Sequence, residues 1–286
     1  MQVGQKLQET AGLLAARGVS ESHLKAEYIL SRALNCHRLE LPLQQKRELS
    51  EGQAEQVAVR AGRVIAGEPI QYVLGDMDFM GRAFKTDSRA LIPRPETETL
   101  VENVLACKDV WSLQTPAIAD VGTGTGCIVV TLALERPNGE YLAIDTSTGA
   151  LELAQENAAS LGVEKKIRFM QGDLLAGVQA RSLDLVVSNP PYVSTDEIET
   201  LQPDIRNHEP RLALDGGPDG MRVISKLVPQ AFSCLRSGGW LFLEIGEDQG
   251  ERVSALMKKN GFEEVEVQKD LGAHDRVACG KKRYVR

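Results

Sequence analysis

From Ala117 to the end of the chain, short apolar runs alternate with longer amphipathic stretches, and this alternation constrains the fold more than any other feature. The apolar runs are rich in β-branched residues and predict strands, whereas the stretches between them have helical periodicity. Strands that alternate with helices form a mostly parallel sheet with helices on both faces, and ligands bind at the carboxyl ends of its strands. The expected strands are 117–121, 140–144, 167–171, 183–188, 240–245, 265–269 and 276–279, and the expected helices are 128–135, 147–161, 223–235 and 249–260.

The first part of the chain has a different pattern. Residues from about 4 to 66 show helical periodicity only, with Ser20 as the expected cap of a second helix and Ser50 with Gln53 as a capping box for a third. Aromatic residues around a glycine turn at 79–84 then predict a short hairpin. The expected parts are a helical domain that docks a partner (1–68), a hairpin linker (69–92) and an α/β domain (93–286).

Composition narrows the class of partner. The chain has 286 residues, of which 42% are hydrophobic and 26% are charged, as in soluble globular proteins. Its 33 Lys and Arg residues are outnumbered by 40 Asp and Glu residues. The resulting formal charge of −7 does not suit stable nucleic-acid binding. We expect the basic run at 281–286 to be a solvated chain end.

The five cysteines and four histidines are scattered, without Cys-x-x-Cys or another metal-ligand spacing. This pattern predicts reduced thiols and no metal site. The chain starts without the apolar segment of a signal peptide, and no apolar run approaches membrane-spanning length. We therefore expect a cytoplasmic protein that binds no membrane.

A glycine-rich turn, Gly122-Thr123-Gly124-Thr125-Gly126, follows the first expected strand of the α/β part. Glycines let the backbone bend sharply and approach a ligand, and the N–H groups of the next helix point toward it. Asp145 ends the second strand, where a carboxylate would accept the hydroxyl groups of a ribose, and Asp173 follows the third strand. The dinucleotide fingerprint requires a third glycine where this chain has Cys127 or Val129, so the turn predicts a nucleoside site of another kind.

The fourth expected strand ends at Asn189-Pro190-Pro191-Tyr192. Neither proline has an N–H group, and Pro190 holds Asn189 in an extended conformation. The side-chain oxygen of Asn189 and the carbonyl of Pro190 are therefore acceptors without a competing donor at either proline. Tyr192 adds a flat aromatic face. Such a turn is suited to a planar –NH2 group, which presents two donors in one plane.

Together, the glycine-rich turn and the Asn-Pro-Pro-Tyr turn resemble motifs of class I S-adenosylmethionine-dependent methyltransferases. Asn-Pro-Pro-Tyr is the variant shared by adenine-N6 DNA methyltransferases and protein-glutamine methyltransferases. Further segments narrow the resemblance to the bacterial release-factor glutamine methyltransferases, the HemK/PrmC family. These segments lie at 69–75, 79–82, 92–98, 209–210, 216–220, 243–246 and 249–250. The resemblance runs from about residue 67 to residue 283. The N-terminal part resembles the family only in being helical.

The resemblance implies a Rossmann-like class I methyltransferase fold with a seven-stranded, mostly parallel sheet. It implies S-adenosylmethionine as the cofactor and S-adenosylhomocysteine as the product. The residues implied to bind the cofactor are the glycine-rich turn, Asp145, Asp173, Leu174 and Asn189.

The implied acceptor is the glutamine of the Gly-Gly-Gln motif in class I peptide-chain release factors, methylated at its side-chain nitrogen to modulate translation termination. The resemblance places this glutamine at the Asn-Pro-Pro-Tyr turn, including Pro191, with Asn189, Pro190 and Tyr192 as catalytic residues. An amide nitrogen is a poor nucleophile because its lone pair is delocalised into the carbonyl. Two acceptors that receive hydrogen bonds from both amide N–H groups fix the nitrogen in place. Their dipoles oppose the positive charge that develops on it. No residue is an obvious general base.

Three residues are further candidates for the site, namely Arg94, Glu96 and Glu244. For Arg94 and Glu96 a structural explanation is also sufficient, because Pro95, Glu96 and Glu98 suit the first turn of a helix. Three other functions remain open from the sequence. They are glutamine methylation of a ribosomal protein, adenine-N6 methylation of a nucleic acid, which should require a basic recognition domain, and non-catalytic nucleoside or NAD binding.

Overall fold

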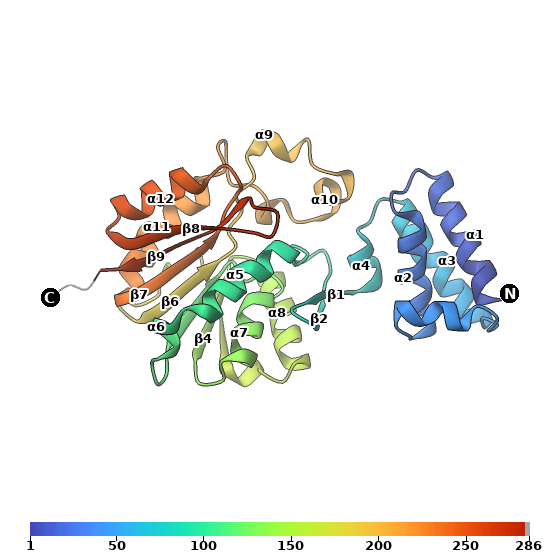
Figure 1. The fold of residues 1–286 in the computed structure, drawn as a ribbon, viewed down its shortest axis with the longest axis horizontal. Coiled ribbons are helices and arrows are strands. Elements are labelled where there is room, and N and C mark those ends of the chain that lie inside the picture. The colour runs from blue at the N-terminus through green and yellow to red at the C-terminus, as the bar shows by residue number, and fades with distance from the viewer. Residues whose placement is uncertain (284–286) are drawn as a thin grey trace. The chain divides into compact units, whose positions relative to one another are not determined.

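The computed structural model describes residues 1–283, which form two compact units (Figure 1). One unit contains residues 1–76 together with 202–208, and the other contains residues 77–201 together with the described residues from 209 onward. The sequence does not mark 202–208, which lies far along the chain, as part of the helical unit.

The first unit is helical. Its helices are α1 (Val3–Ala16), α2 (Ser22–Leu34), η1 (Arg38–Gln44), α3 (Glu51–Ile65), α4 (Ile70–Leu74) and α10 (Pro203–His208). The expected capping box is confirmed, because Ser50 accepts from the Gln53 N–H and the Gln53 side chain accepts from the Ser50 N–H. The expected cap at Ser20 is wrong, because α2 starts two residues later, after Glu21 in a left-handed conformation.

A two-stranded hairpin, β1 (Asp76–Phe79) and β2 (Arg82–Lys85), follows. Met80 and Gly81 make its two-residue turn, and both have positive φ, as a type I′ turn requires. Phe79 and Phe84 meet edge to face within the core of the second unit. This is the short hairpin that the aromatic and glycine pattern predicts.

The second unit is built on a seven-stranded sheet of order β5-β4-β3-β6-β7-β9-β8. Strands β3 to β7 run parallel, and β9 lies antiparallel between β7 and β8. The strands are β3 (Ala117–Val121), β4 (Glu140–Asp145), β5 (Ile167–Gln171), β6 (Leu183–Ser188), β7 (Leu235–Glu244), β8 (Phe262–Lys269) and β9 (Asp275–Lys282). The predicted fold class, a mostly parallel seven-stranded sheet with an N-terminal helical part and a hairpin, is confirmed.

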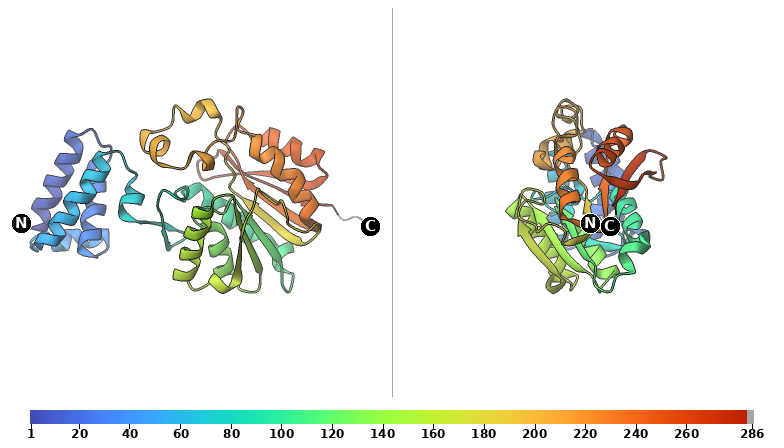
Figure 2. Two further views of the ribbon diagram at one scale, coloured as in Figure 1. Left: turned by 180° about the vertical axis from the view of Figure 1, so that it is seen from behind. Right: turned by 90° about the vertical axis from the view of Figure 1, so that its left-hand side faces the viewer.

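Helices cover both faces of this sheet (Figure 2). Side chains alternate between the faces, so that Leu185 and Val187 of β6 pack in one apolar cluster and Val186 packs in the other. The first cluster includes α5 (Pro95–Ala106) and α7 (Cys127–Glu135), and the second includes α11 (Arg222–Cys234) and α12 (Gly250–Lys259). The remaining helices of the unit are α6 (Lys108–Trp111), α8 (Thr148–Ser160), η2 (Glu164–Lys166), α9 (Thr195–Ile198) and η3 (Arg211–Ala213).

Part of the basic run near the C-terminus differs from its expected solvated state, whereas Arg283 is exposed as expected. Lys281 and Lys282 belong to β9, and Lys282 is buried, with its ammonium donating to the carbonyls of Phe232 and Leu235. The last basic residue of the run, Arg286, lies outside the described residues. Burial lowers the pKa of Lys282.

Candidate active site

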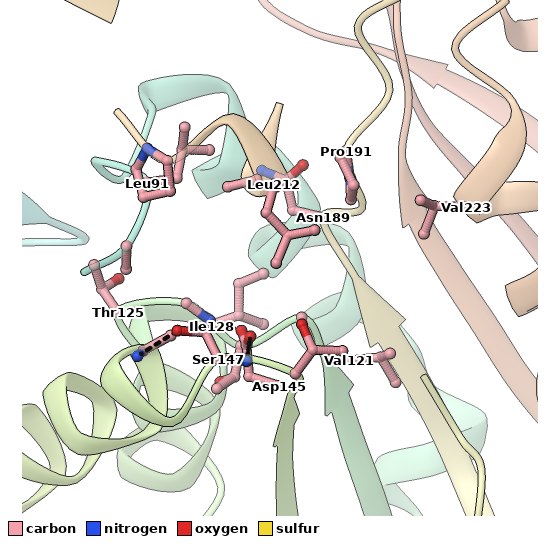
Figure 3. Close-up of a pocket in the computed structure, with 18 of the residues that line it drawn as sticks. Leu91, Val121, Thr125, Ile128, Asp145, Ser147, Asn189, Pro191, Leu212 and Val223 are labelled. Atoms are coloured by element: carbon pink, nitrogen blue, oxygen red, sulfur yellow. Dashed lines mark hydrogen bonds between the residues drawn. The ribbon is translucent and has the colours of Figure 1, made fainter. Parts of the chain in front are cut away.

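A cavity of about 250 Å³ opens at the carboxyl ends of β3, β4 and β6. Figure 3 shows Leu91 and Leu212 on one side of it and Val121, Asp145 and Ser147 on the other. All of its lining residues belong to the sheet unit. The parallel sheet therefore places the site where open α/β folds bind their ligands.

The glycine-rich turn lines this cavity through residues 122–125, whereas its last residue, Gly126, is buried and does not. Gly122, Gly124 and Gly126 all have positive φ, which side chains other than glycine rarely adopt. At Gly126 the need for glycine is also steric, because an added Cβ would lie 3.0 Å from the Cβ of Ala154 in α8. The structure thus explains why glycine stands at these three positions.

Asp145 lies at the end of β4 and faces the turn. Its Oδ2 accepts from the N–H of Gly124 at 3.0 Å, and its Oδ1 accepts from the N–H of Ser147 at 2.9 Å. Each carboxylate oxygen keeps a further lone pair for another donor. These two bonds fix the carboxylate in the cavity wall.

Other residues of the predicted cofactor set occupy this side of the cavity. Asp173 and Leu174 follow β5 and line it, and Leu174 has a φ of 56°, a conformation that is uncommon for a residue with a side chain. Asp120 lies behind the turn, fully buried, and its Oδ2 accepts from the Thr123 hydroxyl at 2.7 Å. Burial raises the pKa of Asp120 to about 7.

The Asn-Pro-Pro-Tyr turn begins one residue after β6. Asn189 and Pro191 line the cavity, whereas Pro190 and Tyr192 are not among its lining residues. The Nδ2 of Asn189 donates to the Thr97 hydroxyl at 3.1 Å. Within residues 1–283, neither the Oδ1 of Asn189 nor the carbonyl of Pro190 accepts a hydrogen bond. Asn189, which lines the cavity, therefore keeps a free acceptor there, whereas Pro190 is buried and does not line the cavity.

A buried carboxylate lies behind this turn. Glu244 ends β7 and is 1% exposed. Its Oε2 accepts from the Thr97 hydroxyl at 2.7 Å, and its Oε1 accepts from the Tyr192 hydroxyl at 3.1 Å. Asn189, Thr97, Glu244 and Tyr192 thus form one chain of hydrogen bonds.

Burial raises the pKa of Glu244 from its ordinary value of 4.5 to about 6. The hydrogen bonds from Thr97 and Tyr192 and the positive charge of Arg276 oppose this shift, and the negative charge of Glu96 adds to it. With a pKa of about 6, the ionised form of Glu244 predominates at neutral pH. Burial and the Glu244 charge raise the pKa of Tyr192, which stays protonated.

The glycine loop at 215–220 packs directly on the Asn-Pro-Pro-Tyr turn. The N–H of Gly216 donates to the carbonyl of Val193 at 2.8 Å. Gln249 bridges from the other side, because its Nε2 donates to the Tyr192 carbonyl at 3.0 Å and its Oε1 accepts from the Gly246 N–H at 3.0 Å. An added Cβ on Gly220 would collide with that same carbonyl of Tyr192. The backbone around Tyr192 is thus held from two sides.

The remaining candidates occupy different positions. Arg94 lines the cavity and forms an ion pair with Glu209, whose side chain is 1% exposed. Glu209 also accepts from the Ile92 N–H at 3.2 Å, so this pair joins two segments of the cavity wall. Glu96 is exposed and does not line the cavity, and α5 starts at Pro95 as expected.

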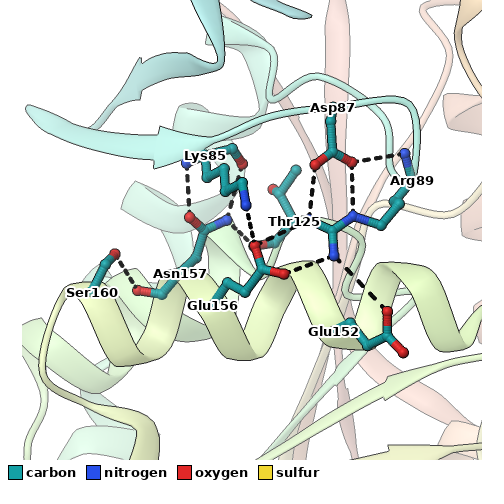
Figure 4. A network of polar contacts seen from close by, with 8 residues as sticks. All are labelled: Lys85, Asp87, Arg89, Thr125, Glu152, Glu156, Asn157 and Ser160. Atoms are coloured by element: carbon teal, nitrogen blue, oxygen red, sulfur yellow. Dashed lines mark hydrogen bonds and ion pairs between the residues drawn. The ribbon is translucent and has the colours of Figure 1, made fainter.

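A polar network anchors the glycine-rich turn to the hairpin (Figure 4). The Oδ1 of Asn157 accepts from the Lys85 N–H at 2.7 Å, and its Nδ2 donates to the carbonyls of Lys85 and Thr125 at 3.1 and 2.9 Å. Arg89, which lines the cavity, pairs with Asp87 and Glu156 beside it. Asn157 is 1% exposed, so its amide links β2, α8 and the turn.

Sequence reasoning does not identify Thr97 and Asn157. In the sequence, Thr97 is marked only by its place in the first turn of a helix, between two acidic residues. Asn157 had no signal beyond being a polar residue on the buried face of an amphipathic helix. Among the described residues, no group of His, Cys, Asp and Glu could hold a metal ion, and no helix is long and apolar enough to cross a membrane.

Two family models match the chain. Residues 5–75 match the PrmC N-terminal domain, and residues 97–216 match the methyltransferase small domain. Among solved structures, the hMettl16 catalytic domain in complex with the MAT2A 3′UTR hairpin 1 has a TM-score of 0.59 at 17% identity and covers 80% of each chain. A methyltransferase from Pyrococcus furiosus has a TM-score of 0.51 at 16% identity over 79% of this chain and 100% of its own. These likenesses concern the fold.

Curated relatives match almost the whole chain. The release factor glutamine methyltransferase of Moorella thermoacetica is 41% identical over 284 residues, which is 99% of both chains. That of Caulobacter vibrioides is 40% identical over 272 residues, covering 93% of this chain and 91% of the relative. The cavity, its glycine-rich turn and the Asn-Pro-Pro-Tyr turn therefore lie in a chain that belongs to the release factor glutamine methyltransferase family, PrmC/HemK.

Proposed function

We propose that this protein transfers a methyl group from S-adenosylmethionine to the side-chain amide nitrogen of the glutamine in the Gly-Gly-Gln motif of class I peptide-chain release factors, in the cytoplasm. The observation that carries this proposal is the arrangement at Asn189. Its side chain lines the same cavity as the glycine-rich turn and Asp145, with Nδ2 held by Thr97 and Oδ1 left to accept.

The residues on the turn side of the cavity fit the cofactor. Gly122 and Gly124 line the cavity with positive φ and leave the backbone accessible, whereas Gly126 is buried against α8. The Asp145 carboxylate can accept the ribose hydroxyls while it stays bonded to Gly124 and Ser147. When bound, S-adenosylmethionine supplies an electrophilic methyl group on a positively charged sulfur. Asp173 and Leu174 line the neighbouring part of the cavity, where the rest of the nucleoside would lie.

The residues on the Asn189 side act on the acceptor. The Oδ1 of Asn189 and the carbonyl of Pro190 accept hydrogen bonds from the two N–H groups of the glutamine side chain and hold its nitrogen in line with the methyl group. The nitrogen gains the methyl group and then loses one proton, which leaves to solvent. Their dipoles oppose the positive charge that develops on this nitrogen, and they are already oriented before the reaction. Tyr192, fixed by Glu244 and Gln249, holds the end of the turn in place.

The helical unit is the proposed docking element for the release factor. Glycines next to the acceptor glutamine let a loop tip approach the turn without a Cβ clash. A short Gly-Gly-Gln peptide would lack the part of the release factor that binds the helical unit. Intact release factor should therefore be methylated far better than the peptide. Deleting residues 1–66 should raise KM for the release factor much more than it changes cofactor affinity. Equal turnover of peptide and protein would contradict the docking role.

Asn189→Ala tests the catalytic assignment. Removing one preorganised polar contact to the reacting group should lower kcat by roughly 10²–10³-fold. Cofactor affinity, measured by calorimetric titration, should change far less. If single-turnover methyl transfer to an intact release factor proceeds at the wild-type rate, Asn189 is structural. Methylation of a ribosomal protein or of DNA or RNA in place of the release factor would overturn the substrate assignment.

A further inference from the structure

Thr97 has a position that its place in the sequence does not reveal. It is the third residue of α5, it is 2% exposed, and it lines the cavity. Its single hydroxyl contacts two side chains that come from distant parts of the chain. Oγ1 lies 2.7 Å from Glu244 Oε2 and 3.1 Å from Asn189 Nδ2.

Counting protons in this chain of contacts decides the orientation of Asn189. A threonine hydroxyl has one proton, and an ionised carboxylate has none. The hydroxyl proton therefore points to Glu244, and toward Asn189 the Thr97 oxygen can act only as an acceptor. If the carboxamide were reversed, Asn189 Oδ1 would face Thr97 Oγ1, and the hydroxyl proton of Thr97 already points to Glu244. Only the orientation with Nδ2 toward Thr97 and Oδ1 toward the cavity satisfies every group.

We propose that Thr97 and Glu244 are positioning residues that lock the Asn189 carboxamide with its oxygen facing the acceptor amide. This inference rests on the proposed function, because it requires Asn189 to contact that amide. The same carboxylate accepts from Tyr192 through Oε1, so Glu244 holds both ends of the Asn-Pro-Pro-Tyr turn. Thr97 and Glu244 act through Asn189 and Tyr192.

This fixed orientation of the Asn189 carboxamide by Thr97 and Glu244, here called the lock, has a consequence for the class of acceptor. An oxygen that faces the cavity accepts from a primary amide or amine, which has protons to donate. A glutamate side chain in the same place would set a carboxylate oxygen against Oδ1, with no proton between them. A freely flipping Asn189 would offer its –NH2 group to that carboxylate. The lock therefore favours glutamine over glutamate by repulsion as well as by attraction.

Three matched variants test the proposal in the full-length protein. Thr97→Val keeps the shape and removes the hydroxyl, whereas Thr97→Ser keeps the hydroxyl. Thr131→Val removes a hydroxyl from α7 that is equally buried and has no hydrogen-bond partner among the described residues. Single-turnover methylation of intact release factor should fall about tenfold in Thr97→Val, as expected for one neutral hydrogen bond, and should change little in the other two. Calorimetry should find similar S-adenosylmethionine affinity in all three.

A double-mutant cycle separates positioning from general packing. If Thr97 acts through Asn189, adding Thr97→Val to Asn189→Ala should cause no further loss of rate. A full additional tenfold loss in that background would overturn the proposal, as would an equal loss in Thr97→Ser or a wild-type rate in Thr97→Val. Should Thr97→Val fail to fold, Thr97→Ala makes the same comparison.

A second readout keeps this test independent of the proposed function. Hydrogen exchange of the Asn189 side-chain –NH2 group, followed by NMR, reports its bond to Thr97 without any acceptor present. Exchange should become faster in Thr97→Val and stay slow in Thr97→Ser. Unchanged exchange in Thr97→Val would overturn the lock. An intact lock in a wild-type protein that methylates no release factor would instead refute the proposed function.

Discussion

Replacing Gly220 by alanine should damage the active site through the backbone of Tyr192. Gly220 is buried in the glycine loop with a φ of 72°. An added Cβ would lie 2.5 Å from Gln249 Nε2 and closer still to the Tyr192 carbonyl oxygen. Real Cβ atoms do not approach backbone oxygens so closely. The loop, Gln249 or the Asn-Pro-Pro-Tyr turn must therefore move.

The magnitude follows from three contributions. A left-handed backbone costs a residue with a side chain about 1–2 kcal/mol. Overpacking a buried site adds about 1–3 kcal/mol, and losing the hydrogen bond from Gln249 to Tyr192 adds about 1 kcal/mol. Gly162→Ala is the matched control, because Gly162 has a φ of 76° with nothing within 4 Å of an added Cβ. Gly220→Ala should therefore lose about 2–4 kcal/mol more than Gly162→Ala.

Urea denaturation of both variants measures this difference in the free energy of unfolding. Methyl transfer supplies the second measurement, because a displacement of about 1 Å at a reacting group can cost about 10²-fold in rate. Gly162→Ala should keep the wild-type rate. If the two variants are equally stable and equally active, the contact between the glycine loop and Tyr192 does not support the site, and the reasoning is wrong.

Three further predictions concern the carboxylates and their pH dependence. Asp145→Ala should weaken S-adenosylmethionine binding by roughly 10- to 100-fold, because it removes hydrogen bonds to a charged acceptor, and unchanged affinity by calorimetry in a folded variant would refute the assignment. The single-turnover rate should fall as the pH drops through about 6, because protonated Glu244 no longer forces the Thr97 proton to its side; a flat profile to pH 5 would contradict the lock. Because the pKa of Glu244 is raised, the folded state binds more protons than the unfolded state between pH 4.5 and 6. Glu244 therefore stabilises the folded state at low pH. This contribution of about 2 kcal/mol is lost as the pH rises through 6. Urea denaturation across this range should show a pH dependence that Glu244→Gln removes.

Local patterns predicted the sheet and the glycine-rich side of the cavity. The strand at 183–188 is an unbroken apolar run because it is buried on both faces, and such runs are read directly from the sequence. The glycines at 122–126 are also a local signal, because each of the three requires positive φ. Asp145 follows from its place at a strand end. Each of these features depends on neighbours in the sequence.

What the sequence did not reveal depends on long-range contacts. The Thr97 hydroxyl meets Glu244, 147 residues away, and Asn189, 92 residues away. A contact between residues so far apart leaves no periodic pattern in the sequence. The sequence therefore offers Glu244 as a candidate site residue without a role, and it does not indicate Thr97. Lys282 was expected in solvent because its charge and terminal position favour it, yet two carbonyls satisfy its ammonium inside the sheet unit. Burial of a charge depends on partners that only the fold supplies.

The most direct test of the central claim is to locate the transferred methyl group. The full-length protein is incubated with S-adenosylmethionine and an intact, unmethylated class I release factor, and the digested release factor is analysed by mass spectrometry. The account predicts the mass gain of one methyl group on the side-chain nitrogen of the Gly-Gly-Gln glutamine, strongly reduced with the Asn189→Ala variant. Methyl transfer to another residue, or none to the release factor while DNA, RNA or a ribosomal protein becomes methylated, would contradict it.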